Sequence, residues 1–343
     1  MKKILLTGAT GFIGSHIAEY FNSQGEDITC LVRPNSKKDF LNSLNIKTIE
    51  GELGNLNELE EKLKNFNFVI HTAGKVSDWG KYSDFEASNI TNTLNLLKAS
   101  IENGIKDFII TGTNSCYGEE SSTKIKDENC EYNSHYNYFP GRIFPSAMNF
   151  YRDSKAISIE KAKNLAFKEQ FNLTVIHPVF VYGEREFSSG FYEYLKSVSS
   201  GIKIFPGSLK NKFHTIYARN LAKIYHLAYK KVLKGVNEFI AGDKTAEYQH
   251  VIYEKFCEYA GFKPPFLMPK EILYIPGFLM ELIYTMLRTE KPPVLTRARV
   301  NMFYDNIEYS TVKLIKEFDY TPDYDLDEGI ERTVKWYKAN NYL

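Results

Sequence analysis

The sequence has few cysteines and no motif that would hold a metal ion or a disulfide framework. Cys30, Cys116, Cys130 and Cys257 are scattered along 343 residues and form no C-x-x-C pair. The seven histidines show no metal-ligand spacing such as H-E-x-x-H. These absences argue against a zinc site and against a disulfide-stapled secreted scaffold. We therefore expect reduced thiols, a cytoplasmic location and no metal centre.

Long hydrophobic runs and an excess of charge of one sign are also missing. The longest apolar stretch, residues 274–287, contains Pro276, Gly277 and Glu281 and cannot span a bilayer. The apolar run at the N-terminus ends at Thr7, too early for a signal peptide. Lys and Arg (43) balance Asp and Glu (42), so nothing indicates a nucleic-acid partner or electrostatic steering to a membrane. We expect a soluble protein without a transmembrane segment.

The chain is organised around its first twenty residues. Residues 3–7 (KILLT) form a short apolar run of strand type, and residues 15–21 have a helical pattern. Between them, in TGATGFIGSH, Gly8 permits a tight turn, Gly11 lets the backbone approach a pyrophosphate, and Gly14 lets the helix pack closely on the strand. The helix N-terminus would face the anion with free N–H groups. The motif predicts dinucleotide binding.

Strands alternate with helices along the rest of the chain. Further strands are expected at residues 27–32, 47–50, 66–72, 107–111, 172–177 and 238–241. Long helical patterns cover residues 85–103 and 148–171, and the first has apolar residues at helical spacing that we expect to face the core, namely Ile90, Leu94, Leu97 and Ile101. This alternation predicts an α/β fold with a doubly wound parallel sheet, which binds ligands beyond the carboxyl ends of its strands.

The second strand ends in Arg33, with Lys37 and Lys38 close behind. An NAD site normally offers an Asp or Glu here, whereas an NADP site offers a cation to the 2′-phosphate. Glu26 and Asp27 are acidic but precede the strand end. We therefore favour NADP(H), with NAD(H) as the alternative if Arg33 is only a solvated loop charge.

Small and polar residues follow the fourth strand, in HTAGKVSDWG. Ala73 and Gly74 would let a cofactor lie against the backbone, whereas His71 is expected to be a packed or capping residue. In the helix that follows, Asn89 is the polar residue nearest the ligand end of the sheet.

Hydroxyl groups follow the fifth strand, in TGTNSCYG, at Thr111, Thr113 and Ser115, close to where a nicotinamide would lie. The alternative is that they only cap and turn the chain. Residues 119–146 have no clear periodicity, and so long a connection is typical of a lid or mobile flap.

The next helix opens with YRDSK, in which Tyr151 and Lys155 share one helical face. The cation can lower the phenol pKa from about 10 toward neutrality, and such a phenol can exchange a proton with a substrate oxygen. The spacing recurs at Tyr192, Tyr259 and Tyr309, where we expect solvated helix faces. We assign the proton-transfer role to the copy at Tyr151 by its position, because only this copy lies between the fifth and sixth strands.

In this order, TGATGFIG, the strand end at Thr113 and YRDSK resemble an extended short-chain dehydrogenase/reductase, of the NAD-dependent epimerase/dehydratase superfamily. HTAG, SNITNTLNLLKAS, HPVFVYG, HTIYARNLA and the last helix DLDEGIERTVKWYKANN match in the same order, so the resemblance covers essentially the whole chain. HPVFVYG and KPPVLTRARVNMFYDNIEYSTVKLIKEFDYTP favour the dihydroflavonol-reductase and 3β-hydroxysteroid-dehydrogenase-like branch. His177 departs from the family, which commonly has an Arg before the proline.

The resemblance implies a Rossmann domain (1–183 and 212–241) and a smaller C-terminal substrate-binding cap (184–211 and 242–343). Tyr151 would be the general acid/base, Lys155 would bind the nicotinamide ribose, and Thr113 would bind the substrate oxygen. A homodimer through the two long helices is implied as well. The residues implied to bind the cofactor are Gly8, Thr10, Gly11, Phe12, Ile13, Gly14, Arg33, Lys37, Glu52, Leu53, Thr72, Ala73, Gly74, Asn89, Tyr151, Lys155, Pro178 and Val181.

These observations predict an NADP(H)-dependent oxidoreductase that interconverts a carbonyl and an alcohol on an apolar small molecule. The cap carries many apolar side chains that we expect to line its pocket: Phe187, Phe191, Phe205, Phe266, Leu267, Met268, Tyr274, Phe278 and Met280. Its cations follow no recognisable nucleotide-sugar pattern: Arg185, Lys203, Lys210, Lys212 and Arg219. The alternatives are a nucleotide-sugar epimerase or dehydratase with bound NAD, and a non-catalytic NADP sensor. Residues 274–287 would contribute to the cap pocket or form a buried helix.

Overall fold

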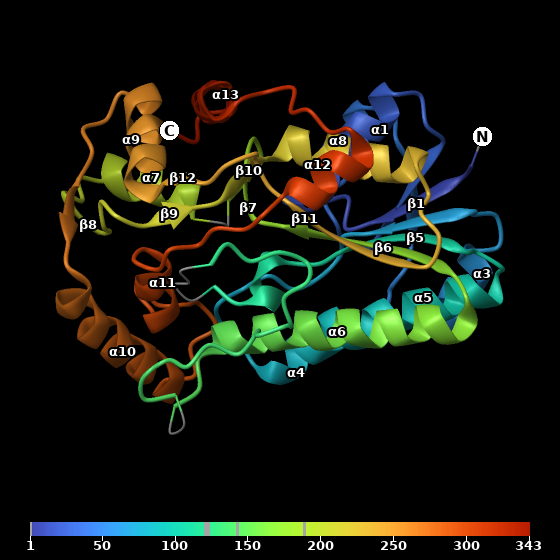
Figure 1. Ribbon diagram of the computed structural model, residues 1–343, viewed down its shortest axis with the longest axis horizontal. Coiled ribbons are helices and arrows are strands. Elements are labelled where there is room, and N and C mark those ends of the chain that lie inside the picture. The colour runs from blue at the N-terminus through green and yellow to red at the C-terminus, as the bar shows by residue number, and fades with distance from the viewer. Residues whose placement is uncertain (1, 120–123, 142–143, 188–189) are drawn as a thin grey trace.

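The computed structural model describes residues 2–119, 124–141, 144–187 and 190–343, and it confirms the α/β fold (Figure 1). Seven parallel strands form one sheet in the order β11-β6-β5-β4-β1-β2-β3. These strands are β1 (Ile4–Thr7), β2 (Ile28–Val32), β3 (Lys47–Glu50), β4 (Phe68–His71), β5 (Asp107–Thr111), β6 (Asn172–Pro178) and β11 (Val236–Ala241). All seven strands expected from the sequence are present. The strand order reverses between β1 and β4, which is where a doubly wound sheet binds its ligand.

Apolar side chains on both faces of the strands give the sheet two cores. Ile4 and Leu6 lie in one core and Leu5 in the other, because successive side chains of a strand point to opposite faces. The first core is covered by α1 (Phe12–Ser23), α2 (Asp39–Ser43), α8 (Ala218–Lys230) and α12 (Val312–Phe318). The second is covered by α3 (Leu56–Lys62), α5 (Asn92–Glu102) and α6 (Ala147–Glu169). The helices thus enclose the sheet from both sides.

The helix expected at residues 85–103 is not regular. It begins as α4 (Tyr82–Phe85), passes through a π-helical turn, η1 (Glu86–Thr91), and continues as α5. A π turn holds an additional residue, so the apolar stripe shifts relative to that of a regular helix. Ile90 and Leu97 are buried as expected, and Ile101 packs at the edge of the second core. The expectation for Leu94 is wrong, because this side chain is only partly buried and belongs to neither core.

A smaller cap lies beside the carboxyl ends of the strands (Figure 1). It contains α7 (Phe191–Ser199), α9 (Gln249–Ala260), α10 (Lys270–Met286), α11 (Arg297–Met302), β8 (Ile204–Pro206), β9 (Lys212–Phe213), β12 (Glu247–Tyr248) and β13 (Phe266–Met268). The remaining elements are β7 (Phe180–Tyr182), β10 (Thr215–Tyr217), the 3₁₀ turn η2 (Asn114–Tyr117) and α13 (Leu326–Ala339). In the part of the chain that the structure describes, no helix is long and apolar enough to cross a membrane.

The C-terminal region joins the two parts of the molecule. α13 packs on α9 of the cap and on β10, whereas α12 packs on β11 and α8 beside the sheet. The predicted division into a Rossmann domain and a cap stays a prediction, but α12, from the segment assigned to the cap, contacts the sheet.

Candidate active site

The glycine-rich loop between β1 and α1 fits too tightly for any other residue at two positions. Gly8 has φ +80°, and a Cβ there would lie 2.5 Å from the Thr72 hydroxyl and 2.6 Å from the Ala73 nitrogen. A Cβ on Gly14 would lie 2.2 Å from the Gly8 carbonyl oxygen. Gly11 precedes the first turn of α1, where no side chain caps the helix and no acidic residue is present. The first N–H groups of α1 are thus available to an anion, and the cradle suits a dinucleotide pyrophosphate.

The predicted cofactor residues on this loop are open to a ligand. Thr10 and Gly11 are exposed, and Phe12 and Ile13 are half-buried. The loop meets the end of β4, where the Thr72 hydroxyl donates to the Thr7 carbonyl at 2.7 Å. The ends of β1 and β4 are therefore fixed against each other at the reversal of strand order.

Asn89 orients the loop after β4 and does not project into open space. Its Oδ1 accepts from the Lys75 backbone at 2.7 Å, and its Nδ2 donates to Ser154 on α6 at 2.9 Å. His71 lies between the hydroxyls of Thr7 and Thr93, at 2.7 and 2.9 Å. Burial, followed by the charge of Lys155, lowers the pKa of His71 to about 3. The packed role expected for His71 is confirmed.

Thr113, Tyr151 and Lys155 come together at the carboxyl end of β5. Thr113 precedes η2, and the other two lie one turn apart on α6. All three are buried, and the side chains of Thr113 and Tyr151 are close enough to interact. Lys155 Nζ donates to the Thr111 carbonyl at 2.6 Å. The sequence thus identified three residues that the fold brings into one buried cluster.

The expected lowering of the Tyr151 pKa is wrong for the protein alone. Burial raises the pKa of Tyr151, and the hydrogen bond with Thr113 opposes that rise. Burial also lowers the pKa of Lys155 to about 8. The Lys155 ammonium group donates to the Thr111 carbonyl. Desolvation of Tyr151 and of Lys155 therefore affects their pKa values more than the attraction between the two groups does.

Sequence reasoning missed an ion pair that continues this cluster inward. The Thr113 hydroxyl donates to Ser115 at 3.1 Å, and Ser115 donates to the Glu119 carboxylate at 2.5 Å. Glu119 also accepts from Arg152, the neighbour of Tyr151 on α6, and both side chains are buried. The sequence offered two signals, namely Glu119 directly after CYG and Arg152 within YRDSK. Nothing in the spacing of these two residues indicates that they form a pair.

His177 supports the same strand end. Its ring lies within 2.9 Å of Glu238 on one side and within 3.1 Å of the Thr113 carbonyl on the other. Burial alone would raise the pKa of Glu238, but hydrogen bonds from His177, Lys163 and Tyr132 lower it to about 2. A Cβ on Gly112 would lie 2.4 Å from the His177 ring. The departure from the family at His177 therefore positions Thr113.

The segment expected to be a flap is anchored where the structure describes it. Tyr136 donates to Asp305 at 2.8 Å, and Tyr138 is 2% exposed. Arg297 of α11 donates to the Phe144 carbonyl at 2.9 Å. The described residues of 119–146 therefore pack against the body and the cap. Residues 120–123 and 142–143 lie outside the described part.

The residues predicted to select the coenzyme lie at the same sheet edge as the glycine loop, because β2 pairs with β1. The side chains of Arg33 and Lys37 are exposed, and they make no hydrogen bond or ion pair with any described residue. Lys38 pairs with Glu50 at the end of β3. The other predicted positions are exposed Glu52, half-buried Leu53, Pro178 at the end of β6, and Val181 in β7.

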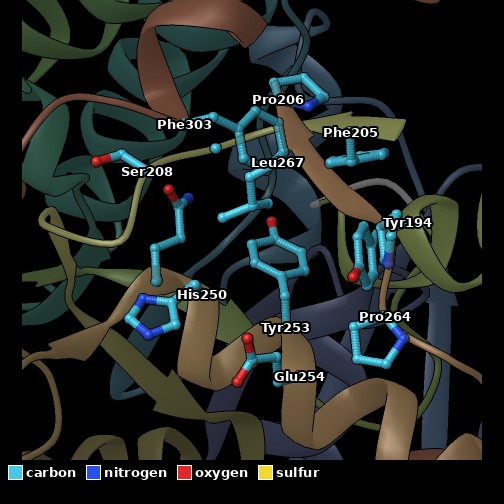
Figure 2. Close-up of a pocket in the computed structure, with 13 residues that line it drawn as sticks. Tyr194, Phe205, Pro206, Ser208, His250, Tyr253, Glu254, Pro264, Leu267 and Phe303 are labelled. Atoms are coloured by element: carbon cyan, nitrogen blue, oxygen red, sulfur yellow. The ribbon is translucent and has the colours of Figure 1, made fainter. Parts of the chain in front are cut away.

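The apolar residues expected to line one cap pocket are dispersed. Phe191 lies in the core, and Phe205 and Leu267 border a pocket between α7, α9, β8 and β13 (Figure 2). Its volume of about 30 Å³ is on the order of a single water, and Tyr151 does not line it. Phe266 and Met280 are exposed. The expectation of one common pocket is wrong, because of the expected residues only Phe205 and Leu267 line this pocket.

The remaining residues of that set also serve other contacts. Phe187 packs on Tyr192 and Trp336, and Tyr274 and Phe278 contact the anchored flap. Met268 is half-buried. Of the other Tyr-x-x-x-Lys copies, Tyr192 and Tyr309 are 8% and 4% exposed. The expectation that they lie on solvated helix faces is wrong.

Three of the cations considered for a sugar diphosphate are already neutralised. Arg185 pairs with Glu19 at 2.8 Å, and Arg219 pairs with Glu184 at 3.2 Å. Lys212 pairs with Glu308 at 3.0 Å, and Lys203 and Lys210 are exposed. Among the described residues, no group of three or more His, Cys, Asp or Glu side chains could hold a metal ion.

Known proteins of two kinds are similar to the chain over its whole length. A 3β-hydroxysteroid dehydrogenase/Δ5→4-isomerase of Monkeypox virus is 24% identical, covering 98% of both chains. An N-acetyl-α-D-glucosaminyl-diphospho-ditrans,octacis-undecaprenol 4-epimerase of Escherichia coli O157:H7 is 24% identical, covering 97% of this chain and 94% of that one. The crystal structure of a UDP-glucose 4-epimerase from Thermotoga maritima, 20% identical, superposes with a TM-score of 0.77 over 99% of both chains. It shares the fold.

The model of the NAD dependent epimerase/dehydratase family matches residues 4–242, which include the glycine loop, Thr113, Tyr151 and Lys155. Strand order, glycine cradle and the position of YRDSK agree with this match. The chain belongs to the NAD dependent epimerase/dehydratase family, within the extended short-chain dehydrogenase/reductase superfamily.

Proposed function

We propose that the protein is an NADP(H)-dependent oxidoreductase that interconverts a ketone or aldehyde and an alcohol on a mainly apolar small molecule. The observation that carries the proposal is the cluster of Thr113, Tyr151 and Lys155, all three buried at the carboxyl end of β5. Two hydroxyls at one point can bind and protonate one oxygen atom. A cofactor sensor would not need this arrangement.

The chain's own residues manage the proton and the substrate oxygen. When bound, the dinucleotide gives or accepts the hydride. Tyr151 donates a proton to the carbonyl oxygen in reduction and accepts it back in oxidation. Thr113 orients that oxygen. Lys155 binds the nicotinamide ribose, and the charge of Arg152 opposes the burial that raises the Tyr151 pKa.

Ser115 and Glu119 fix the direction of the hydrogen bonds behind Thr113. Because Thr113 donates to Ser115 and Ser115 donates to Glu119, the Thr113 oxygen acts as an acceptor, and one of its lone pairs already accepts from the Ser115 backbone N–H at 3.3 Å. An alcohol substrate can donate to it directly. Arg152 compensates the buried charge of Glu119.

The coenzyme assignment rests on Arg33 and Lys37. Both cations are exposed at the sheet edge that holds the glycine loop, and a guanidinium pairs bidentately with a phosphate. The adenosine 2′-phosphate is the group that distinguishes NADP from NAD. NAD(H) is the alternative.

An apolar substrate is supported by the neutralised cations and by the relatives. Arg185 and Arg219 are occupied by Glu19 and Glu184, which leaves them poorly placed to bind a diphosphate. The names of the viral and E. coli relatives describe a steroid and a polyprenol-linked sugar, and both substrates contain a large apolar part.

The second candidate function is epimerisation of a nucleotide sugar or lipid-linked sugar with bound NAD. The name of the E. coli relative favours it, and the same Tyr151 and Thr113 could serve an oxidation followed by reduction of one sugar carbon. A cytoplasmic location and a homodimer stay predictions. The four cysteines are unpaired, which supports a reducing compartment.

Ligand-induced thermal stabilisation separates the two functions. A ligand that binds only the native state raises the melting temperature, by an amount that grows with the logarithm of its concentration divided by its dissociation constant. With NADP present, we expect hydrophobic ketones or secondary alcohols to raise the melting temperature of the purified protein, and UDP-sugars to leave it unchanged. Stabilisation by a UDP-sugar at micromolar concentration, with none by the ketones, would favour the epimerase.

Replacing Tyr151 with Phe should remove the proton donor and leave the fold intact. We expect kcat for ketone reduction to fall by at least about 100-fold, with the dissociation constant for NADPH nearly unchanged. Tyr192→Phe, at another Tyr-x-x-x-Lys copy, is the control and should keep its activity. Steady-state kinetics and coenzyme titration measure both effects. Retention of most activity in Tyr151→Phe would show that another group transfers the proton.

Replacing Lys155 with Met should stabilise the protein without coenzyme while abolishing turnover. Burial lowers the pKa of Lys155 from 10.5 to about 8, so the folded state carries the cost of a buried charge at pH 7. Removing the charge should raise the free energy of unfolding by about 1–3 kcal/mol, allowing for the lost hydrogen bond to Thr111.

The pH dependence of that difference has a defined sign. Below pH 8 the lysine is charged in both states, and the cost is present in full. As pH rises from about 8 to 10.5, the folded state loses its proton first, so the cost and the difference between the two proteins shrink. Urea unfolding at a series of pH values measures this. A Lys155→Met variant that is less stable at pH 7, with no change over this window, would contradict it.

Replacing Arg33 with Asp should shift the coenzyme preference toward NAD. The change removes a phosphate ligand and adds an acceptor for the ribose hydroxyls, so we expect the ratio of the NADPH and NADH dissociation constants to change by about tenfold or more. Lys168→Asp on α6 makes the same charge change far from the glycine loop and should leave the ratio unchanged. Equal dissociation constants for the two coenzymes in the wild-type protein would overturn the assignment.

A further inference from the structure

Helix α10 carries its charge inside and its apolar side chains outside. Its only buried residues are Gly277 and Glu281, and Glu281 pairs with Arg297 at 2.8 Å. Seven apolar side chains between residues 272 and 287 are 41–73% exposed, namely Ile272, Ile275, Leu279, Met280, Ile283, Met286 and Leu287. A helix that faces water normally has the opposite arrangement.

These side chains form one continuous face. At about 100° per residue they fall within an arc of roughly 140°, and Pro276 is the only other exposed residue in that arc. Gly277 lets the opposite side approach Val300 and Thr296 of the α11 region, where a Cβ would lie 3.3–3.4 Å from them. α10 is therefore firmly attached by its inner side, while its apolar face remains exposed at the outer edge of the cap (Figure 1).

Neighbouring segments also expose apolar side chains. Phe266 and Leu267 on β13, just before α10, are 73% and 38% exposed. Phe139 of the anchored flap is 79% exposed, and its backbone exchanges hydrogen bonds with the Tyr274 hydroxyl on α10. Exposed apolar patches of this extent mark interaction sites.

The composition of the face indicates which partner covers it. Protein interfaces contain about one hydrogen bond per 100–200 Å². The arc offers no polar or charged side chain that could make one or fix the register of a partner chain. Lipid acyl chains form no hydrogen bonds and therefore need no such side chain.

The charges at the two ends of the helix complement an anionic surface. Lys263 and Lys270 precede the face, and Arg288 and Lys291 follow it. The exposed acidic residues beside them are Glu271 and Glu290. Glu281 does not face the surface, because it is buried in its pair with Arg297. Lys270 lies 3.8 Å from Asp305. An apolar face between basic ends is the pattern of a helix that lies in the headgroup region of an anionic bilayer.

We propose that α10, with Phe266 and Leu267, is a docking face that inserts into the surface of a bilayer containing anionic lipids. The helix lies in the plane of the interface and does not cross it. The proposal goes beyond the oxidoreductase function and does not depend on the coenzyme.

Vesicle sedimentation tests the docking face with the full-length protein. Vesicles of phosphatidylcholine with phosphatidylglycerol should carry the protein into the pellet, and pure phosphatidylcholine should carry less. Ile283→Glu should weaken the partition coefficient by about tenfold, because a charge replaces a buried apolar group. Ile275→Glu combined with Ile283→Glu should abolish binding.

Val312→Glu on α12 is the matched control. Val312 and Ile283 are 53% and 51% exposed, so the two changes place the same charge at equally exposed sites. Val312→Glu should bind vesicles like the wild type. Unchanged melting temperatures would show that the variants are folded, and Arg288→Glu with Lys291→Glu should reduce binding to anionic vesicles selectively.

Two results would overturn the proposal. One is a wild-type protein that stays in the supernatant with anionic vesicles. The other is a dimer in sedimentation velocity that Ile283→Glu dissociates, with vesicle binding unaffected, which would assign the face to a second copy of the chain. Because neither readout uses turnover, failure here would leave the proposed oxidoreductase function untouched.

Discussion

Burial of ionisable side chains at the carboxyl end of β5 is the constraint on which the site depends. Burial raises the pKa of Tyr151 and lowers that of Lys155, so the protein alone pushes both groups toward their neutral forms. The helix that carries them must nevertheless hold them within reach of Thr113. Burial that destabilises the charged forms is typical of catalytic groups, whose pKa values are shifted by desolvation and by one specific partner.

Several polar contacts between distant segments hold that end of the sheet in place. Asn89 joins the loop after β4 to Ser154 on α6. His177 joins the Thr113 backbone to Glu238 on β11, and the Glu119–Arg152 pair closes the cluster from the flap side. Each of these side chains has a partner on a different element, although Arg152 Nε and Nη1 are buried without a hydrogen-bond partner among the described residues. The position of Tyr151 is thus determined by the sheet, α6 and the flap together. Buried networks of this kind are rigid when satisfied.

The parts of this arrangement that depend on local spacing could be predicted from the sequence. Gly8 and Gly14 reveal the nucleotide loop, because the tight turn after the first strand requires a glycine at Gly8 and the close contact between helix and strand requires one at Gly14. YRDSK places two groups on one helical face. The Glu119–Arg152 pair could not be predicted, because its members are 33 residues apart in sequence and no periodicity links them. The π turn at Glu86–Thr91 similarly displaced Leu94 from the core.

The orientation of α10 shows a second limit. Residues 274–287 are apolar nearly all round, so periodicity indicates no preferred inner face, and a cap pocket and a buried helix were equally consistent with it. Glu281 determines which side of α10 faces inward, because it pairs with the buried Arg297 of another helix. A tertiary ion pair thus exposed the apolar face, and the sequence pattern alone did not contain that information.

The central claim is that Tyr151 and Thr113 serve hydride transfer to and from an external substrate. Isotope tracing tests it most directly. The wild-type protein is incubated with NADPH deuterated at the transferred position and a set of hydrophobic ketones, and the products are analysed by mass spectrometry. We expect an alcohol carrying one deuterium, formed by the wild type and not by Tyr151→Phe. Epimerisation of a sugar substrate without deuterium in any product, and with the label kept on the coenzyme, would contradict it.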